Sequence, residues 1–333
     1  MGGSSISSRD MESHYESRGY YGANSYYSGG YSRTVTPTRS VKDASEIFKQ
    51  EKMRDEFNPA KIKLPREACD SAQSPHSRAI ILAEDVTGSM GRFLLKLIQK
   101  QFPEMIEKIY KTVSFNPHIM FMGVGDVAAR DEAPLQVTQF ETDLRMLEQL
   151  EKIWLEQGGG GNGSESYILP WYFAGKYCKM DCFDKRGEKG FLFTFGDDGP
   201  TPKLTADELE TVFGKREDLD RRKVTATDCL EMASEKFNCY HIMLDGGAYD
   251  KYVYYEWSKL MGGHACFLSD YECLPDLVST ILKMYEGFSK TDAIEAIEES
   301  HSKYVVREAL KNHEEYVVDK KVEVETDAEV EVF

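Results

Sequence analysis

Three side chains that carry oxygen ligands follow an apolar run near residue 80. Each lies two positions after the one before. Asp85 is followed by Thr87 and Ser89 in the loop Glu84-Asp-Val-Thr-Gly-Ser-Met-Gly91. An aspartate at the end of a strand, with hydroxyls two and four residues on, can direct three oxygens at one point as the chain turns into a helix. Gly88 lets the backbone approach that point closely. Carboxylates and hydroxyls suit Mg²⁺, Mn²⁺ or Ca²⁺, so the spacing indicates a site for a hard cation.

Three further loops carry the same kinds of side chain. Asp126 follows the run 118–123, Asp197 and Asp198 follow the run 190–195, and Asn162 lies in a glycine-rich loop at 157–165. Ligands bind at the carboxyl ends of the strands in an open parallel sheet, so we expect these loops on one rim. The oxygen ligands that they would bring together are Asp85, Thr87, Ser89, Asn162, Asp126 and Asp197.

The elements that must position these loops alternate along the chain. Short apolar runs typical of buried parallel strands occur at 79–83, 118–123, 190–195, 239–244 and 264–268. Helical spacing of apolar residues predicts helices at 90–112, 141–156, 249–261 and 274–285, and Thr205 to Glu208 forms a capping box before another. The run 135–140 alternates apolar and polar residues, which predicts an edge strand. The pattern predicts an α/β fold with a doubly wound, mostly parallel sheet and helices on both faces.

The motif Asp85-x-Thr87-x-Ser89 after a buried strand resembles the DxSxS signature of von Willebrand factor A (vWA) domains, with threonine at the first hydroxyl position. The glycine-rich loop and Asp197 follow in the order that this family uses, and the loop is most similar to a bacterial and phage-type branch. The resemblance implies a metal-ion-dependent adhesion site with Asp85, Thr87, Ser89, Asn162 and Asp197 as ligands. In the glycine-rich loop, Asn162, Ser164 or Ser166 could supply the ligand.

Several of these residues also have a structural interpretation. Asp85 could simply cap the following helix. Asp126 could form a turn or contact the metal through water, and Asp198 could be solvated beside Asp197. Glu165 could be a charge at a helix N-terminus or a partner behind the ligands. The sequence leaves these alternatives open.

The resemblance implies a non-catalytic, metal-dependent protein-binding module. Its cofactor would be Mg²⁺, or Mn²⁺ or Ca²⁺, and an exposed Asp or Glu of a partner protein would complete the coordination. One alternative is a haloacid-dehalogenase-like phosphoryl transferase, because Asp85-Val-Thr-Gly-Ser89 also resembles the first motif of those enzymes, with Asp85 as nucleophile. That chemistry needs a lysine, and Lys176, Lys179 and Lys203 lie in no recognisable motif. A self-assembling structural protein is a further alternative.

Composition sets the remaining expectations. The 333 residues carry 41 basic and 57 acidic side chains, a net charge of -16, which disfavours general binding to nucleic acid. No apolar run is long enough for a membrane span, and no secretory signal is visible, so we expect a cytoplasmic or virion-associated protein without membrane contact. The seven cysteines lack paired spacing, which favours reduced core thiols over a zinc site.

Four regions differ in composition. Residues 1–40 form a Ser/Gly/Tyr-rich tail that we expect to be disordered and that could self-associate. Residues 41–77 form a polar arm with a short helix, and residues 78–288 form the vWA-like domain. Residues 289–333 contain a charged helix, expected from 292 to 315, and an acidic tail that alternates valine with charge.

Overall fold

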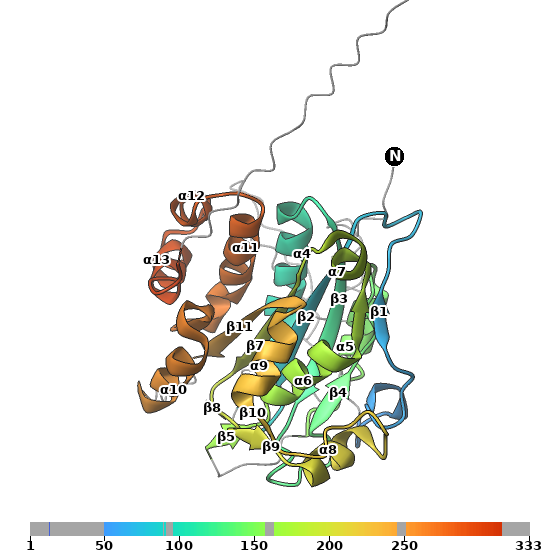
Figure 1. Ribbon diagram of the computed structural model, residues 1–333. Helices are drawn as coiled ribbons and strands as arrows, with labels where there is room; N and C mark the ends of the chain where they lie inside the picture. The colour runs from blue at the N-terminus through green and yellow to red at the C-terminus, as the bar shows by residue number, and fades with distance from the viewer. Residues whose placement is uncertain are drawn as a thin grey trace, which may run out of the picture.

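The computed structural model describes residues 50–88, 90, 96–156, 163–244 and 251–314, together with residue 13. Two expectations for the chain ends, the tail at 1–40 and the acidic tail beyond 314, lie outside the described residues, apart from residue 13. Most of the short helix expected in the arm also lies outside them. The chain forms a mixed α/β structure around a six-stranded central sheet (Figure 1).

The central sheet is mostly parallel, as predicted. Its strand order is β12-β11-β7-β2-β3-β4, and only the β3–β4 pair is antiparallel. The strands are β2 (Ser77–Asp85), β3 (Asn116–Val124), β4 (Leu135–Val137), β7 (Gly190–Gly196), β11 (Phe237–Leu244) and β12 (Ala265–Leu268). All seven residues of β7 are buried, which agrees with the prediction of fully buried strands.

An edge strand is confirmed, but β4 covers only the first half of the expected range 135–140 and is more enclosed than its alternating sequence predicts. All three of its residues are buried. The polar residue Gln136 tolerates burial because its side chain bonds the backbone of Trp154 twice. Its Nε2 donates to the Trp154 carbonyl at 2.8 Å, and its Oε1 accepts from the Trp154 amide at 2.9 Å.

Three pairs of short strands lie outside the central sheet. β1 (Arg66–Ala68) pairs with β6 (Cys178–Met180), β5 (Ser164–Glu165) with β8 (Gly199–Pro200), and β9 (Lys203–Leu204) with β10 (Val224–Thr225). Within the arm, the structure thus forms β1 and a 3₁₀ turn at Asp55–Phe57. Figure 1 shows β5, β8, β9 and β10 together at one end of the central sheet.

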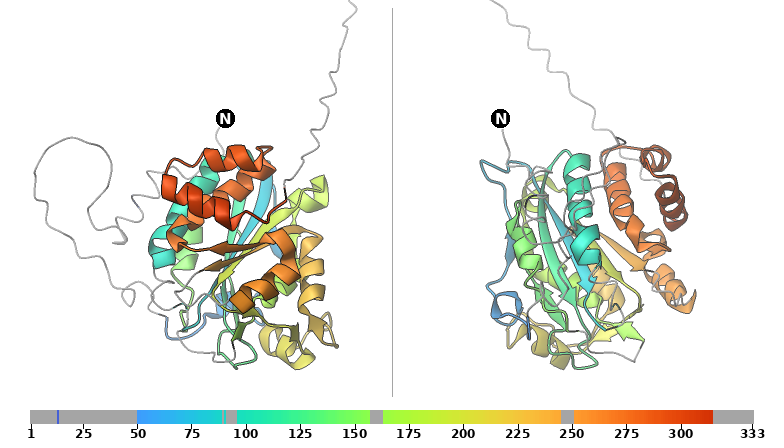
Figure 2. Two further views of the ribbon diagram at one scale, coloured as in Figure 1. Left: turned by 90° about the vertical axis from the view of Figure 1, so that its left-hand side faces the viewer. Right: turned by 180° about the vertical axis from the view of Figure 1, so that it is seen from behind.

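Helices pack on both sides of the central strands, and the apolar side chains of β2, β3 and β7 alternate between two hydrophobic clusters. Ile80 and Leu82 belong to one cluster with residues of α4 and α11, and the view from behind in Figure 2 shows these two helices beside each other. Ala79 and Ile81 belong to the other cluster with residues of α6 and α9. The helices are α4 (Phe102–Thr112), α5 (Arg145–Leu150), α6 (Ile168–Tyr177), α7 (Asp181–Arg186), α8 (Ala206–Phe213), α9 (Ala226–Ser234), α10 (Lys251–Met261), α11 (Leu274–Tyr285), α12 (Lys290–Glu295) and α13 (Ser300–Ala309).

Local signals explain where several helices begin. The expected capping box of Thr205 and Glu208 starts α8, and α11 has the predicted bounds. In the stretch 141–156, where one helix is expected, the structure forms only the shorter helix α5. The helix expected from 292 to 315 is divided, because Glu299 caps a new helix, α13, by accepting the Ser302 amide. Residues 97–101 form a π-helical turn before α4.

Within the described residues, none of the helices combines the length and apolar character needed to cross a membrane.

Candidate functional site

Strand register brings three of the predicted loops to one edge of the sheet. Asp85 ends β2 and pairs in register with Val124, the last residue of β3. Asp126 therefore follows β3 beside Asp85. On the other side of β2, Glu84 pairs with Phe195 of β7, so Asp197 follows at the same edge. The short β5–β8 pair adds Ser164 and Glu165 there. We call this edge the acidic rim, defined by Glu84, Asp85, Thr87, Asp126, Glu165, Asp197 and Asp198.

Asp85 is fully buried and accepts hydrogen bonds on both carboxylate oxygens. Oδ1 accepts the Thr87 amide at 2.8 Å and the Thr87 hydroxyl at 2.6 Å. Oδ2 accepts the hydroxyl of Tyr167 at 2.6 Å. Asp85 and Thr87 thus lie together as the motif predicts. Burial raises the pKa of Asp85, whereas these hydrogen bonds lower it. Burial is the larger effect and the charge of Asp197 adds to it, so the pKa of Asp85 is raised to about 7.

Tyr167 is held from three sides by the strand and helix residues around it. Its ring makes edge contacts with His241 and Trp257, at centroid distances of 5.0 and 5.6 Å. His241 stacks on Trp257 at 3.5 Å, and Trp257 donates its indole N–H to the Asp198 carbonyl at 3.0 Å. Gly196 leaves the space that the Tyr167 hydroxyl fills, because a Cβ at Gly196 would lie 1.9 Å from that oxygen.

Asp126 shapes its own loop. Its carboxylate accepts the amides of Ala128 and Ala129 at 3.0 and 3.1 Å, and the Ser166 hydroxyl at 2.9 Å. The same Ser166 oxygen accepts the Val127 amide at 3.1 Å. These bonds match the turn interpretation of Asp126, and they tie the loop after β3 to the segment before α6.

Two buried glutamates on the rim have unpartnered oxygens. Glu165 is 1% exposed, and its Oε2 has no hydrogen-bond partner among the described residues. Burial raises the pKa of Glu165 to about 9, and so do the charges of Asp85 and Asp126. Glu84 lies on the opposite face of β2 from Asp85, and within the described part of the chain neither of its carboxylate oxygens has a hydrogen-bond partner. Its pKa is raised well above the usual range, first by burial and then by Asp85 and Asp197.

Asp197 and Asp198 follow β7 and are both partly exposed. Burial raises the pKa of Asp198, and the charges of Asp197 and Asp126 act in the same direction. Asp198 is fixed by its backbone, since its carbonyl accepts from Trp257 and its amide donates to the Tyr167 hydroxyl at 3.4 Å. Two predicted ligands, Ser89 and Asn162, lie outside the described residues.

Sequence reasoning missed three contributors to this arrangement: Glu84, Tyr167 and Gly196. Glu84 could have been noticed because two carboxylates at the end of an otherwise apolar strand are unusual. Tyr167 and Gly196 act on each other across the sheet–helix contact, and no local pattern identifies such a pair. Two of the lysines considered for phosphoryl transfer are engaged elsewhere. Lys176 pairs with Asp220 at 2.7 Å, and Lys179 lies 3.7 Å from Glu67.

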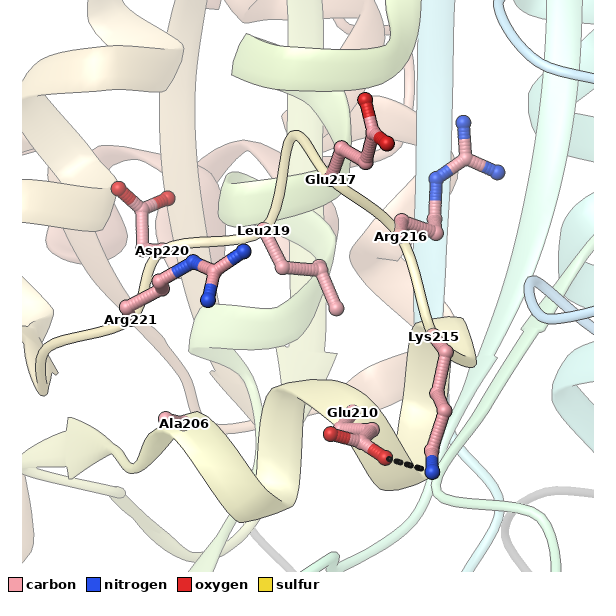
Figure 3. Close-up of a pocket in the computed structure, with 8 residues that line it drawn as sticks. All are labelled: Ala206, Glu210, Lys215, Arg216, Glu217, Leu219, Asp220 and Arg221. Carbon is pink, nitrogen blue, oxygen red and sulfur yellow. Dashed lines mark ion pairs between the residues drawn. The ribbon is translucent and has the colours of Figure 1, made fainter.

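A pocket of about 540 Å³ lies between α8 and the segment that follows it (Figure 3). Its charged side chains are of both signs, and Lys215 lies 3.7 Å from Glu210. It is lined by Ala206, Glu210, Lys215, Arg216, Glu217, Leu219, Asp220 and Arg221, so no residue of the acidic rim contributes to it.

No protein-family model matches the chain, and no curated protein matches it. Among solved structures, two crystal structures of the pilus adhesin SpaC from Lactobacillus rhamnosus GG are similar at 9% identity, one of them in an open conformation. The TM-scores are 0.45 and 0.41, and the match covers 63% of this chain in both. The chain spans 30% and 31% of the length of those adhesin chains.

Proposed function

We propose that this chain is a divalent-cation-dependent protein-binding module with a doubly wound, vWA-like arrangement. The observation that carries the proposal is the acidic rim. Asp85 and Thr87 lie at the carboxyl end of a central strand, within electrostatic reach of Asp197 and Glu165. No described residue gives a hydrogen bond to one buried carboxylate oxygen there, Oε2 of Glu165.

The donor set of the rim fits a hard cation. Its ligand atoms are carboxylate and hydroxyl oxygens, which Mg²⁺, Mn²⁺ and Ca²⁺ prefer over nitrogen and sulfur. Burial and mutual repulsion hold the pKa of Asp85 near 7 and that of Glu165 near 9, so protons balance part of the charge. A cation would take over that role and release protons on binding.

Asp85, Thr87 and Asp197 are the described residues that would hold the ion, and Ser89 and Asn162 are the further candidates from the sequence. The bound cation would supply an electrophilic centre for a carboxylate of the partner. Tyr167 orients Asp85 through its hydrogen bond, and Asp126 and Ser166 fix the neighbouring loop. Glu165 would act behind the ligands, where its charge reaches Asp85.

The first experiment measures thermal unfolding of the full chain in EDTA and in excess Mg²⁺, Mn²⁺ or Ca²⁺. An ion at 100 times its Kd should stabilise the native state by about 2.7 kcal/mol. The Asp85→Ala variant should show no such gain, whereas Asp220→Ala, which removes a carboxylate outside the rim, should keep it. A variant at Asp85 that still gains stability contradicts the ligand set.

The second experiment tests partner chemistry. A peptide display library is selected on the immobilised full chain in Mg²⁺ or Mn²⁺ and, in parallel, in EDTA. Enrichment of peptides with a required Asp or Glu, in the metal arm alone, supports the proposal. Replacing that acid by Asn or Gln should then abolish binding. Metal binding without any carboxylate preference would mean that the ion is structural and the binding proposal is wrong.

A further inference from the structure

Three side chains with different metal-binding atoms meet away from the acidic rim, where η4 (Tyr271–Cys273) lies beside the start of α13. They are Asp270, Cys273 and His301, and one ligand atom from each lies within 4.8 Å of the other two. His301 Nε2 is 2.9 Å from Asp270 Oδ2. Cys273 is buried and His301 is exposed, so the cluster has a sulfur inside and an imidazole that faces solvent.

Separate bonds hold the backbone around these side chains. The second oxygen of Asp270, Oδ1, caps η4 by accepting the Glu272 amide at 2.9 Å. The Cys273 amide donates to the Asp270 carbonyl at 3.0 Å, which places both side chains on one turn. Ser302, next to His301, donates its hydroxyl to Asp276 of α11 at 2.6 Å. Asp270 Oδ2 is thus left to face His301, and the two elements are fixed against each other.

The chemistry of the set selects a class of metal. A thiolate, an imidazole and a carboxylate suit Zn²⁺ and similar first-row ions, whereas Mg²⁺ and Ca²⁺ prefer oxygen alone. Bonds of about 2.0–2.3 Å at tetrahedral angles put ligand atoms roughly 3.3–3.7 Å apart. The observed separations lie close to this range, at 2.9 Å between His301 and Asp270 and within 4.8 Å for every pair. The three ligand atoms are therefore already gathered at about the separations that one ion requires.

The surroundings are acidic, which favours a cation. The carboxylates of Asp270, Asp276 and Glu299 lie within electrostatic reach of the Cys273 thiol. A bound metal would replace the thiol proton and offset this excess of negative charge. The sequence gives no zinc pattern, because the ligands come from two separate elements and only one is a cysteine.

We propose that Asp270, Cys273 and His301 bind one Zn²⁺ or similar transition-metal ion, with water in the fourth position. This site is independent of the acidic rim and of the proposed function. The ion would link η4 to α13 and so fasten the last described helix to the rest of the structure.

The test titrates the metal-free full chain with Co²⁺ and follows thiolate-to-cobalt absorption, then displaces the Co²⁺ with Zn²⁺. We expect saturation at one equivalent and displacement by Zn²⁺ but not by Mg²⁺. Cys273→Ser should abolish the thiolate band, and His301→Ala and Asp270→Asn should weaken affinity at least tenfold. Asp270→Asn retains the oxygen that caps η4, so its effect does not depend on loss of the turn.

Matched controls exclude adventitious binding. Cys69→Ser removes the exposed cysteine, and His76→Ala removes another exposed histidine that pairs with a carboxylate, Glu188, at 3.0 Å. Both variants should give the same thiolate-to-cobalt band and the same affinity as the parent chain. Absence of a thiolate band in the parent chain, or a band that survives in Cys273→Ser, overturns the proposal.

Discussion

The hydroxyl of Tyr167 donates a 2.6 Å hydrogen bond to Asp85 Oδ2 from a position that only a glycine at 196 permits. Tyr167 precedes α6, Asp85 ends β2 and Gly196 ends β7, so one contact joins the helix to two neighbouring strands. The charge of the buried carboxylate thereby depends on how α6 packs on the sheet.

Tyr167→Phe should weaken binding of the divalent cation at the rim about 10- to 100-fold, because a ligand that loses its orienting partner binds metal less well. The variant removes one oxygen and keeps the ring contacts with His241 and Trp257. Titration with Mg²⁺ or Mn²⁺, followed by the midpoint of thermal unfolding, measures the effect. Tyr172→Phe is the control, since its hydroxyl bonds Asp220 instead. Equal affinity in both variants would remove Tyr167 from the site.

Gly196→Ala should destabilise the fold by about 1–3 kcal/mol, since an added methyl would overlap the Tyr167 hydroxyl and ring. Denaturant unfolding in EDTA measures this without contribution from a metal. Shortening the opposing side chain in Gly196→Ala/Tyr167→Leu should make the two changes less than additive. Strictly additive changes in the free energy of unfolding would show that the two residues do not contact each other closely.

Asp197→Ala should weaken binding of the cation. The loss should be smaller than in Asp85→Ala if Asp197 acts through water. Asp198→Ala should have a smaller effect still, because Asp198 is fixed through its backbone carbonyl and amide, which the substitution keeps. Isothermal titration with Mn²⁺ ranks the three variants. Unchanged affinity in Asp197→Ala would take this residue out of the ligand set.

Stability in EDTA should fall as pH rises. Asp85 and Glu165 have folded-state pKa values raised to about 7 and about 9, so the native chain binds more protons than the unfolded chain. Their contribution to the free energy of unfolding is complete below about pH 4. It is lost as the pH rises to about 7 for Asp85 and to about 9 for Glu165. The loss is at most about 1.4 kcal/mol per pH unit for each group.

Urea unfolding between pH 5 and pH 9 measures this dependence. Glu165→Gln should flatten the upper part of the curve, because an amide does not titrate. Saturating Mg²⁺ should also reduce the fall, since the ion takes over the role of the protons. A parent chain that gains stability from pH 6 to pH 9 in EDTA would contradict the raised pKa values.

The sequence predicted the sheet because its signals are local. Buried parallel strands are continuous apolar runs, and the residues after β2, β3 and β7 meet because parallel strands end at one edge. The same reasoning placed Asp85, Asp126 and Asp197 together. The helix expected over 141–156 was too long, since Ile153 stays buried without being helical.

Contacts between distant segments could not be predicted. Tyr167 reaches Asp85 across 82 positions, and His301 reaches Asp270 across 31. Neither pair has a fixed spacing in any motif, because the docking of a helix on a strand or turn sets the contact. Burial of Gln136 also depended on such a contact, with the backbone of Trp154.

Both border strands of the described central sheet are short, since β4 has three residues and β12 has four. β4 is entirely buried, and α10 and α13 pack against β12 at the other border. A long row of free backbone N–H and C=O groups would let copies of the chain add strand to strand into fibrils. The described central sheet offers no such long row, so contacts between copies made through this sheet would use side-chain surfaces rather than added strands.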